Sequence, residues 1–219
     1  MFVGMGANGA GGDYNLESSL RFRSSANAYL SRTPATAGNR QTLTYSCWFK
    51  LGSTELHLLE TGNVSSTLAS IVSLTDGTIR IQDFVSSVQQ YRLITSQVFR
   101  DPSSWYHLVF VLDTTNAIST DRLRLYINGS RVTSFSTEVY PALNYSGTLN
   151  IVESTSIGSR SYNFSAYGDQ YLTEVNLIDG QALTASDFGD YNEDTGVWQP
   201  IEYTGTYGTN GFYLKGRGT

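Results

Sequence analysis

This sequence has little charge, a single cysteine and no long apolar run. Cys47 is the only cysteine among 219 residues, so an internal disulfide and a cluster of thiolate metal ligands are both excluded. Charged residues make up 15% of the chain, below the usual fraction of about 25%. No stretch approaches the about 18 apolar residues that a transmembrane helix needs, so we expect no membrane insertion.

The net charge is −5, which argues against nucleic-acid binding because contact with phosphates needs a basic face. The opening segment, MFVGMGANGAGG, has neither the charged part nor the apolar part of a secretory signal. We therefore expect synthesis in the cytoplasm without a signal peptide. A lone cysteine in a strand-like segment is typically a small buried apolar residue.

Short extended segments dominate the chain, and helical periodicity is nearly absent. Alternate positions of the segment 43–51 place on one face Leu43, Tyr45, Cys47, Phe49 and Leu51. Trp48 falls on the opposite face of this predicted strand. The segment Trp105–Leu112 (WYHLVFVL) is apolar on both faces, which predicts a central strand that is covered on both sides.

Two hairpins are marked by residue pairs that favour tight primed turns. Asp76-Gly77 joins Ser70–Leu74 to Thr78–Phe84, and Asn128-Gly129 joins Arg122–Ile127 to Ser130–Phe135. Further strands are predicted at Leu20–Arg23, Glu55–Leu59, Tyr171–Ile178 and within Thr204–Leu214. A short helical turn is predicted after Thr184, with Asp187 completing a pair like a capping box.

The spacing of these segments predicts an all-β fold. Strands at intervals of roughly 8–12 residues, without long helices, are typical of a two-sheet antiparallel sandwich. We expect a flexible glycine-rich arm at residues 1–13, one sandwich domain at 14–203 and a C-terminal strand or extension at 204–219. One short helical turn near the C-terminus completes the predicted fold.

Four segments together carry a family resemblance. They are Ser19–Tyr29 (SLRFRSSANAY), Leu43–Lys50 (LTYSCWFK), Trp105–Val132 (WYHLVFVLDTTNAISTDRLRLYINGSRV) and Gly168–Phe188 (GDQYLTEVNLIDGQALTASDF). In order and spacing they resemble the concanavalin-A-like, laminin-G-like jelly rolls. The resemblance implies the lectin and glucanase type of sandwich, a fold that hosts lectins, adhesion modules, glycanases and structural parts.

More narrowly, residues 16–214 resemble lectin-like proteins and tail-fibre modules of bacteriophages, as in RFRSSANAYLSRTPATAGNR and TGVWQPIEYTGTYGTNGFYL. This resemblance implies a non-enzymatic protein of the virion surface that decorates the particle or forms part of a fibre. The expected partners are other virion proteins and host-surface glycans. Because a rigid sandwich suits repeated symmetric attachment to a particle, we also expect a homo-oligomer, with a trimer favoured. A tail-fibre module dedicated to host polysaccharide is the first alternative.

A glycan-cleaving enzyme is the second alternative, and the residues disfavour it. Retaining hydrolysis needs two carboxyl groups about 5–5.5 Å apart, yet no Glu-x-Asp-x-Glu pattern is present and Glu174 stands alone in its strand. A serine triad would need His57 or His107. We interpret His107 as a half-buried, hydrogen-bonded strand residue, and we expect no enzyme and no obligatory cofactor.

Two sets of loop residues are the candidates for binding. Aromatic rings and planar polar side chains suit sugars, and the candidates for glycan contact are Tyr162, Asn163, Tyr167, Asp169, Tyr140 and Tyr145. The alternative is that these tyrosines pack a rim or a subunit interface. Asp113, Asn116 and Asp121 are weak calcium candidates, although aspartate and asparagine are also ordinary turn residues.

Overall fold

The computed structural model describes residues 14, 16, 18–53, 55–73 and 76–216. The predicted arm at residues 1–13 lies outside these residues. Within the described part of the chain, the helical elements are three short 3-10 turns, η1 (Ser24–Ala26), η2 (Ser119–Asp121) and η3 (Ala185–Asp187). No helix among these residues has the length and hydropathy needed to cross a bilayer.

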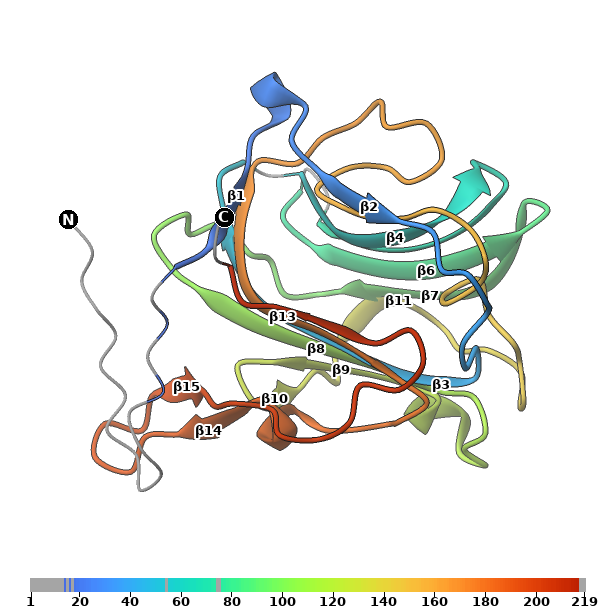
Figure 1. The fold of residues 1–219 in the computed structure, drawn as a ribbon. Helices are drawn as coiled ribbons and strands as arrows, with labels where there is room; N and C mark the ends of the chain where they lie inside the picture. The colour runs from blue at the N-terminus through green and yellow to red at the C-terminus, as the bar shows by residue number, and fades with distance from the viewer. Residues whose placement is uncertain (1–13, 15, 17, 54, 74–75, 217–219) are drawn as a thin grey trace.

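Two antiparallel sheets of seven strands stack as the layers of a sandwich, which confirms the predicted fold class (Figure 1). The first sheet runs in the order β1 (Leu20–Phe22), β13 (Gln170–Asp179), β3 (Thr42–Leu51), β8 (Tyr106–Asp113), β9 (Leu123–Ile127) and β10 (Ser130–Arg131), with β16 (Phe212–Leu214) also paired to β13. The second runs in the order β11 (Phe135–Val139), β7 (Val88–Thr95), β6 (Ile79–Val85), β5 (Thr67–Ser73), β4 (Leu56–Val64), β12 (Thr155–Ile157) and β2 (Leu30–Arg32).

The main core lies between the two sheets, and alternation along β3 builds its centre. The five residues predicted to share one face, from Leu43 to Leu51, are all buried in this core. Tyr45 lies wholly buried there, and its hydroxyl donates to the Leu58 carbonyl oxygen at 2.7 Å. The period-2 prediction for β3 is therefore confirmed.

A second apolar cluster covers the outer face of the first sheet. The two-stranded hairpin of β14 (Gly189–Tyr191) and β15 (Trp198–Pro200) places Trp198 against Trp48, Val109 and Val111. This cover explains why β8 is apolar on both faces, as the sequence predicts. In Figure 1 the hairpin lies below the first sheet, on the side away from the second sheet.

His107 connects that hairpin to the first sheet. The Trp198 Nε1–H donates to His107 Nδ1 at 2.9 Å, so the proton of the ring is on Nε2, which lies 2.9 Å from the Ser46 hydroxyl. The ring also stacks on Trp48 at 4.8 Å. His107 is fully buried rather than half-buried, because a segment about ninety residues further along the chain covers it.

The predicted local elements are present with some changes in extent. Asn128 and Gly129 both have positive φ angles, 47° and 81°, between the paired β9 and β10. In the first hairpin the last paired residues are Ser73 and Ile79, so its strands do not close directly on Asp76-Gly77. The Thr184–Asp187 capping box is confirmed at η3. The turns at η1 and η2 were not predicted.

Candidate functional site

The two loops predicted to contact glycans lie at opposite ends of the sandwich. Strand β3 pairs Thr42 with Asp113 at one end and Leu51 with Gln170 at the other. The 140–145 loop is tied to the Asp113 end, since the Asn144 N–H donates to the Thr114 carbonyl at 2.8 Å. A strand of this length spans about 30 Å, so the two loops do not form one site.

The tyrosines of the 140–145 loop make contacts within the protein. The Tyr145 hydroxyl donates to Asp83 at 3.1 Å, and its ring meets Tyr91 edge-on. The Tyr140 hydroxyl donates to Glu138 at 2.9 Å, and its ring packs against the main core. These contacts agree with the packing alternative for this loop.

In the 160–169 loop, two candidates shape the backbone. The Asp169 carboxylate accepts hydrogen bonds from the Ser24 N–H at 2.9 Å and the Ser24 hydroxyl at 2.6 Å, and these bonds lower its pKa. The Asn163 side-chain oxygen accepts bonds from Ser165. Tyr162 lies 3.5 Å from an Arg160 nitrogen, and Tyr167 packs near Tyr29. Of the four candidates, Tyr162 is the one that contacts an arginine, Arg160 of its own loop.

The calcium candidates are each engaged locally. Asp113 accepts from the Thr115 hydroxyl, Asn116 accepts from a backbone N–H, and Asp121 pairs with Arg131 at 2.5 Å. Among the described residues, no three histidine, cysteine, aspartate or glutamate side chains gather in a group that could hold a metal ion. Calcium binding at these positions stays a prediction.

A row of polar side chains that the sequence analysis missed crosses the outer face of the second sheet. Strand register pairs Glu60 with Ser70, Ser70 with Gln82, and Gln82 with Arg92. Directly paired residues point to the same side of a sheet, and their neighbours along each strand, such as Ile71 and Ile81, belong to the core. The four polar residues therefore point away from the core.

A second row lies beside the first. It pairs His57 with Val72, Val72 with Arg80, and Arg80 with Ile94. We call the six polar residues of both rows the polar face: His57, Glu60, Ser70, Arg80, Gln82 and Arg92. In Figure 1, β4 and β6 bow toward the first sheet, so this side of the second sheet curves inward.

The 158–169 segment folds over the β4 side of the polar face. The Glu60 carboxylate accepts hydrogen bonds from the Ser161 N–H at 2.8 Å and the Ser161 hydroxyl at 3.3 Å. The Gln170 side chain bonds both the N–H and the carbonyl of His57, each at 2.9 Å. Burial raises the pKa of Glu60, although the bonds from Ser161 oppose that shift. Glu60 thus anchors the loop that borders the face.

Several buried polar atoms of this face have no hydrogen-bond partner among the described residues. They are Nδ1 of His57, Oγ of Ser70 and Nε of both Arg80 and Arg92. His57 Nε2 lies 3.5 Å from a Glu55 oxygen, and burial lowers the pKa of this imidazole. Buried polar groups are normally paired, so part of the hydrogen-bonding capacity of this face is not used by the described residues.

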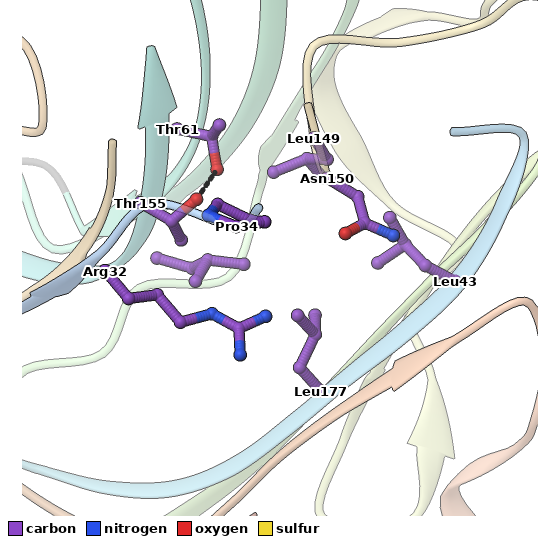
Figure 2. Close-up of a pocket in the computed structure, with 9 residues that line it drawn as sticks. Arg32, Pro34, Leu43, Thr61, Leu149, Asn150, Thr155 and Leu177 are labelled. Atoms are coloured by element: carbon purple, nitrogen blue, oxygen red, sulfur yellow. Dashed lines mark hydrogen bonds between the residues drawn. The ribbon is translucent and has the colours of Figure 1, made fainter. Parts of the chain in front are cut away.

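Two other places are weaker candidates for a ligand site. A cavity with a volume of about 10 Å³ lies in the core beside Arg32, Asn150 and Leu177 (Figure 2). A space of this size holds about one water molecule and is too small for a sugar ring. On the other sheet, the Glu174 carboxylate accepts hydrogen bonds from the hydroxyls of Tyr14 and Tyr213. Burial raises the pKa of Glu174, and its partners belong to the protein itself.

The sequence and the structure were compared with those of known proteins. The family model described as the concanavalin A-like lectin/glucanases superfamily matches residues 24–188. No curated protein sequence matches the chain. Domains LG4-5 of the mouse laminin alpha1 chain superpose with a TM-score of 0.55 at 10% identity, covering 95% of this chain and 50% of theirs.

Two further solved structures share the fold. Domain 4 of an extracellular arabinanase from Geobacillus stearothermophilus, solved with arabinotriose, has a TM-score of 0.50 at 16% identity and covers 85% of this chain and 79% of its own. Tailspike protein 2 of Escherichia coli O157:H7 bacteriophage CAB120 has a TM-score of 0.51 at 14% identity. It is matched over 85% of this chain and 25% of its own length. At these identities the likeness concerns the fold.

Proposed function

Because the chain belongs to the concanavalin A-like lectin/glucanases superfamily, we propose that it binds carbohydrate through the polar face. The observation that carries this proposal is the gathering of polar side chains on the outer face of β4 to β7, where Ser70, Arg80 and Arg92 each have a buried polar atom without a hydrogen-bond partner among the described residues. Leaving such atoms without partners costs about 1–3 kcal/mol each. Arg80 and Arg92 are half-buried, so a ligand rich in hydroxyl groups can reach this face at their side chains.

The side chains of the face suit the chemistry of sugars. Planar groups such as the Gln82 amide and the arginine guanidinium groups can each hold two neighbouring oxygens of one ring. Directly paired strand residues lie about 4.5–5.5 Å apart, which matches the spacing of hydroxyl groups across a pyranose. The half-buried Phe84 lies on the same strand as Gln82 and Arg80, and its apolar ring can cover sugar C–H groups.

We place this binding protein on the surface of a bacteriophage particle, without enzymatic activity. The sequence resemblance to phage lectin-like modules supports this placement, and the fold shared with a phage tailspike agrees with it. In this role the protein decorates the particle or forms part of a fibre. Its partners are other virion proteins and further copies of the chain, which assemble as a trimer. Many copies multiply weak single-site affinity for host glycans. A module dedicated to host polysaccharide is the alternative.

The carboxylates near the polar face bear on the choice between a binding protein and a hydrolase. Glu60 is the one carboxylate that points outward from β4 to β7 within the described residues, and Ser161 already holds it. Glu55, beside His57, is the nearest second carboxylate. The raised pKa of Glu60 would suit a general acid, so release of reducing ends from a bound polysaccharide, abolished by Glu60→Gln, would favour the hydrolase.

A glycan array followed by titration calorimetry tests the binding proposal. We expect at least one saccharide to bind, and we expect Gln82→Ala to weaken that binding about tenfold, which is the loss of one or two hydrogen bonds. The matched control is Gln199→Ala, because Gln199 lies on β15 at the far side of the first sheet. Equal losses in both variants, or no binding to any saccharide, would contradict the proposed site.

The position on the particle has a separate test. Quantitative mass spectrometry of purified virions, combined with gold labelling by antibodies in electron micrographs, gives the copy number and the location. Label over the whole head supports a decoration protein, and label confined to the tail tip supports a receptor-binding module. Absence of the protein from purified particles would exclude both virion roles while leaving carbohydrate binding to be judged by calorimetry.

A further inference from the structure

Two arginines of the polar face lie next to each other, and neither forms a close ion pair with a carboxylate among the described residues. Arg80 on β6 is paired with Ile94, and Arg92 on β7 is paired with Gln82, so the two arginines are diagonal neighbours about 7–8 Å apart. Within the described residues, the close contacts between basic and acidic side chains are His57–Glu55 and Arg131–Asp121. Neither Arg80 nor Arg92 takes part in them, and both are half-buried.

The nearby acidic groups are already in use. Ser161 donates two hydrogen bonds to Glu60, and Glu55 faces the His57 imidazole at 3.5 Å. Arg160, in the loop that borders the face, adds a third positive charge and lies near Tyr162 at 3.5 Å. Three guanidinium groups therefore face two carboxylates, and both carboxylates have other partners.

From this juxtaposition of Arg80 and Arg92 we propose that the polar face selects acidic saccharides, whose carboxylate, sulfate or phosphate group is held between the two guanidinium groups. This inference rests on the proposed carbohydrate binding and adds the ligand class. Ser70 and Gln82, which lie in the same row as Arg92, bind the hydroxyl groups of the sugar that carries the acidic group.

The physical reason is the cost of two like charges that are close together and partly removed from water. Burial, and next the charge of Arg92, lower the pKa of Arg80, and the negative charges of Glu60 and Glu55 offset that shift only in part. An anion relieves both effects, and the planar fork of arginine binds carboxylate and sulfate groups through two parallel hydrogen bonds. The chain as a whole carries a net charge of −5. General attraction to acidic polymers is therefore weak, and binding must come from this local cluster.

The test compares pairs of ligands that differ only in charge. Calorimetry of the full chain uses oligogalacturonate against its carboxyl-reduced form, and dextran sulfate against dextran. We expect the acidic member of a pair to bind at least tenfold more tightly at low salt, with a difference that shrinks as salt rises. The pair that shows this difference distinguishes a carboxylate from a sulfate as the recognised group.

Substitutions then locate the site. We expect Arg80→Gln and Arg92→Gln each to weaken acidic binding about tenfold, with partial retention in the lysine variants, which keep the charge but lose the fork. Arg124→Gln is the matched control, because Arg124 is also a strand arginine with a buried Nε but belongs to the first sheet. Near-UV circular dichroism establishes that each variant is folded, and the lysine variants replace any glutamine variant that is not.

Three outcomes would overturn the inference. Equal affinity for both members of each pair, with sensitivity to Gln82→Ala, would leave carbohydrate binding standing and refute the acidic ligand class. Acidic binding that is unchanged by both Arg80→Gln and Arg92→Gln would refute this site for the anion. No binding to any saccharide would remove the proposed function together with the inference.

Discussion

His107 makes the stability of this sandwich depend on pH in a way that can be calculated. The ring is fully buried, Nδ1 accepts the Trp198 N–H, and Nε2 donates to Ser46. Burial lowers the pKa of this histidine to about 3, whereas an unfolded histidine has a pKa of about 6.5. Below pH 6.5 the unfolded chain binds a proton that the folded chain does not bind until the pH approaches 3. The free energy of unfolding therefore falls as the pH falls through this window.

The magnitude follows from the two pKa values. The single-site linkage relation predicts that His107 alone lowers the free energy of unfolding by about 2 kcal/mol between pH 7 and pH 5. Urea unfolding of the wild type at both pH values measures the total change, and His107→Gln removes this contribution while keeping one donor and one acceptor. We expect the loss between pH 7 and pH 5 to be about 2 kcal/mol smaller in the variant than in the wild type.

Equal losses in the wild type and the variant would refute this account of His107. A second measurement does not depend on folding of the variant: the ring resonances of His107, followed by NMR between pH 8 and pH 5, should not titrate. His57 is the other histidine of the chain, and assignment of both rings separates their contributions. A His107 midpoint near pH 6.5 would show that the ring is accessible to protonation.

Three further predictions concern single positions. Gly129→Ala places a Cβ 2.5 Å from a Trp198 ring carbon at a φ of +81°, so we expect the free energy of unfolding to fall by about 1–3 kcal/mol. An unchanged urea midpoint would contradict this expectation. Glu60→Ala leaves the Ser161 N–H without its acceptor; the Ser161 amide should then exchange hydrogen faster, and native protection in the variant would show that Glu60 is not the anchor. Burial raises the pKa of the Cys47 thiol to about 12, so Ellman's reagent at pH 8 should react with it only after unfolding, and rapid reaction of the native protein would refute its burial.

The strands and the main core could be predicted from the sequence because both follow from local patterns. Alternation along β3 and the Asn128-Gly129 turn are properties of short segments, and the structure confirms them. The complete burial of His107 was missed because the residue that covers it, Trp198, belongs to a hairpin distant in sequence. Periodicity indicates which face of a strand is apolar, and it does not reveal which distant segment covers that face.

The polar face was missed for a different reason. Sequence reasoning looked for sugar contacts in loops, whereas this face is built from alternate strand positions. Arg80 and Gln82 alternate with Ile79 and Ile81 along β6, which is a signal that was available. The contribution of β4 was not available, because an irregularity between His57 and Leu59 shifts the alternation there. Strand order and register, which depend on the whole chain, bring Glu60 into one row with Arg92.

The central claim is that carbohydrate binds on the outer face of the second sheet. Amide chemical-shift mapping by NMR, with a saccharide selected on the array, tests this claim most directly. The account predicts that the perturbed amides cluster on β4 to β7 around Ser70, Gln82 and Arg92. Perturbations centred on the 140–145 loop, or on the outer face of the first sheet around β15, would contradict it.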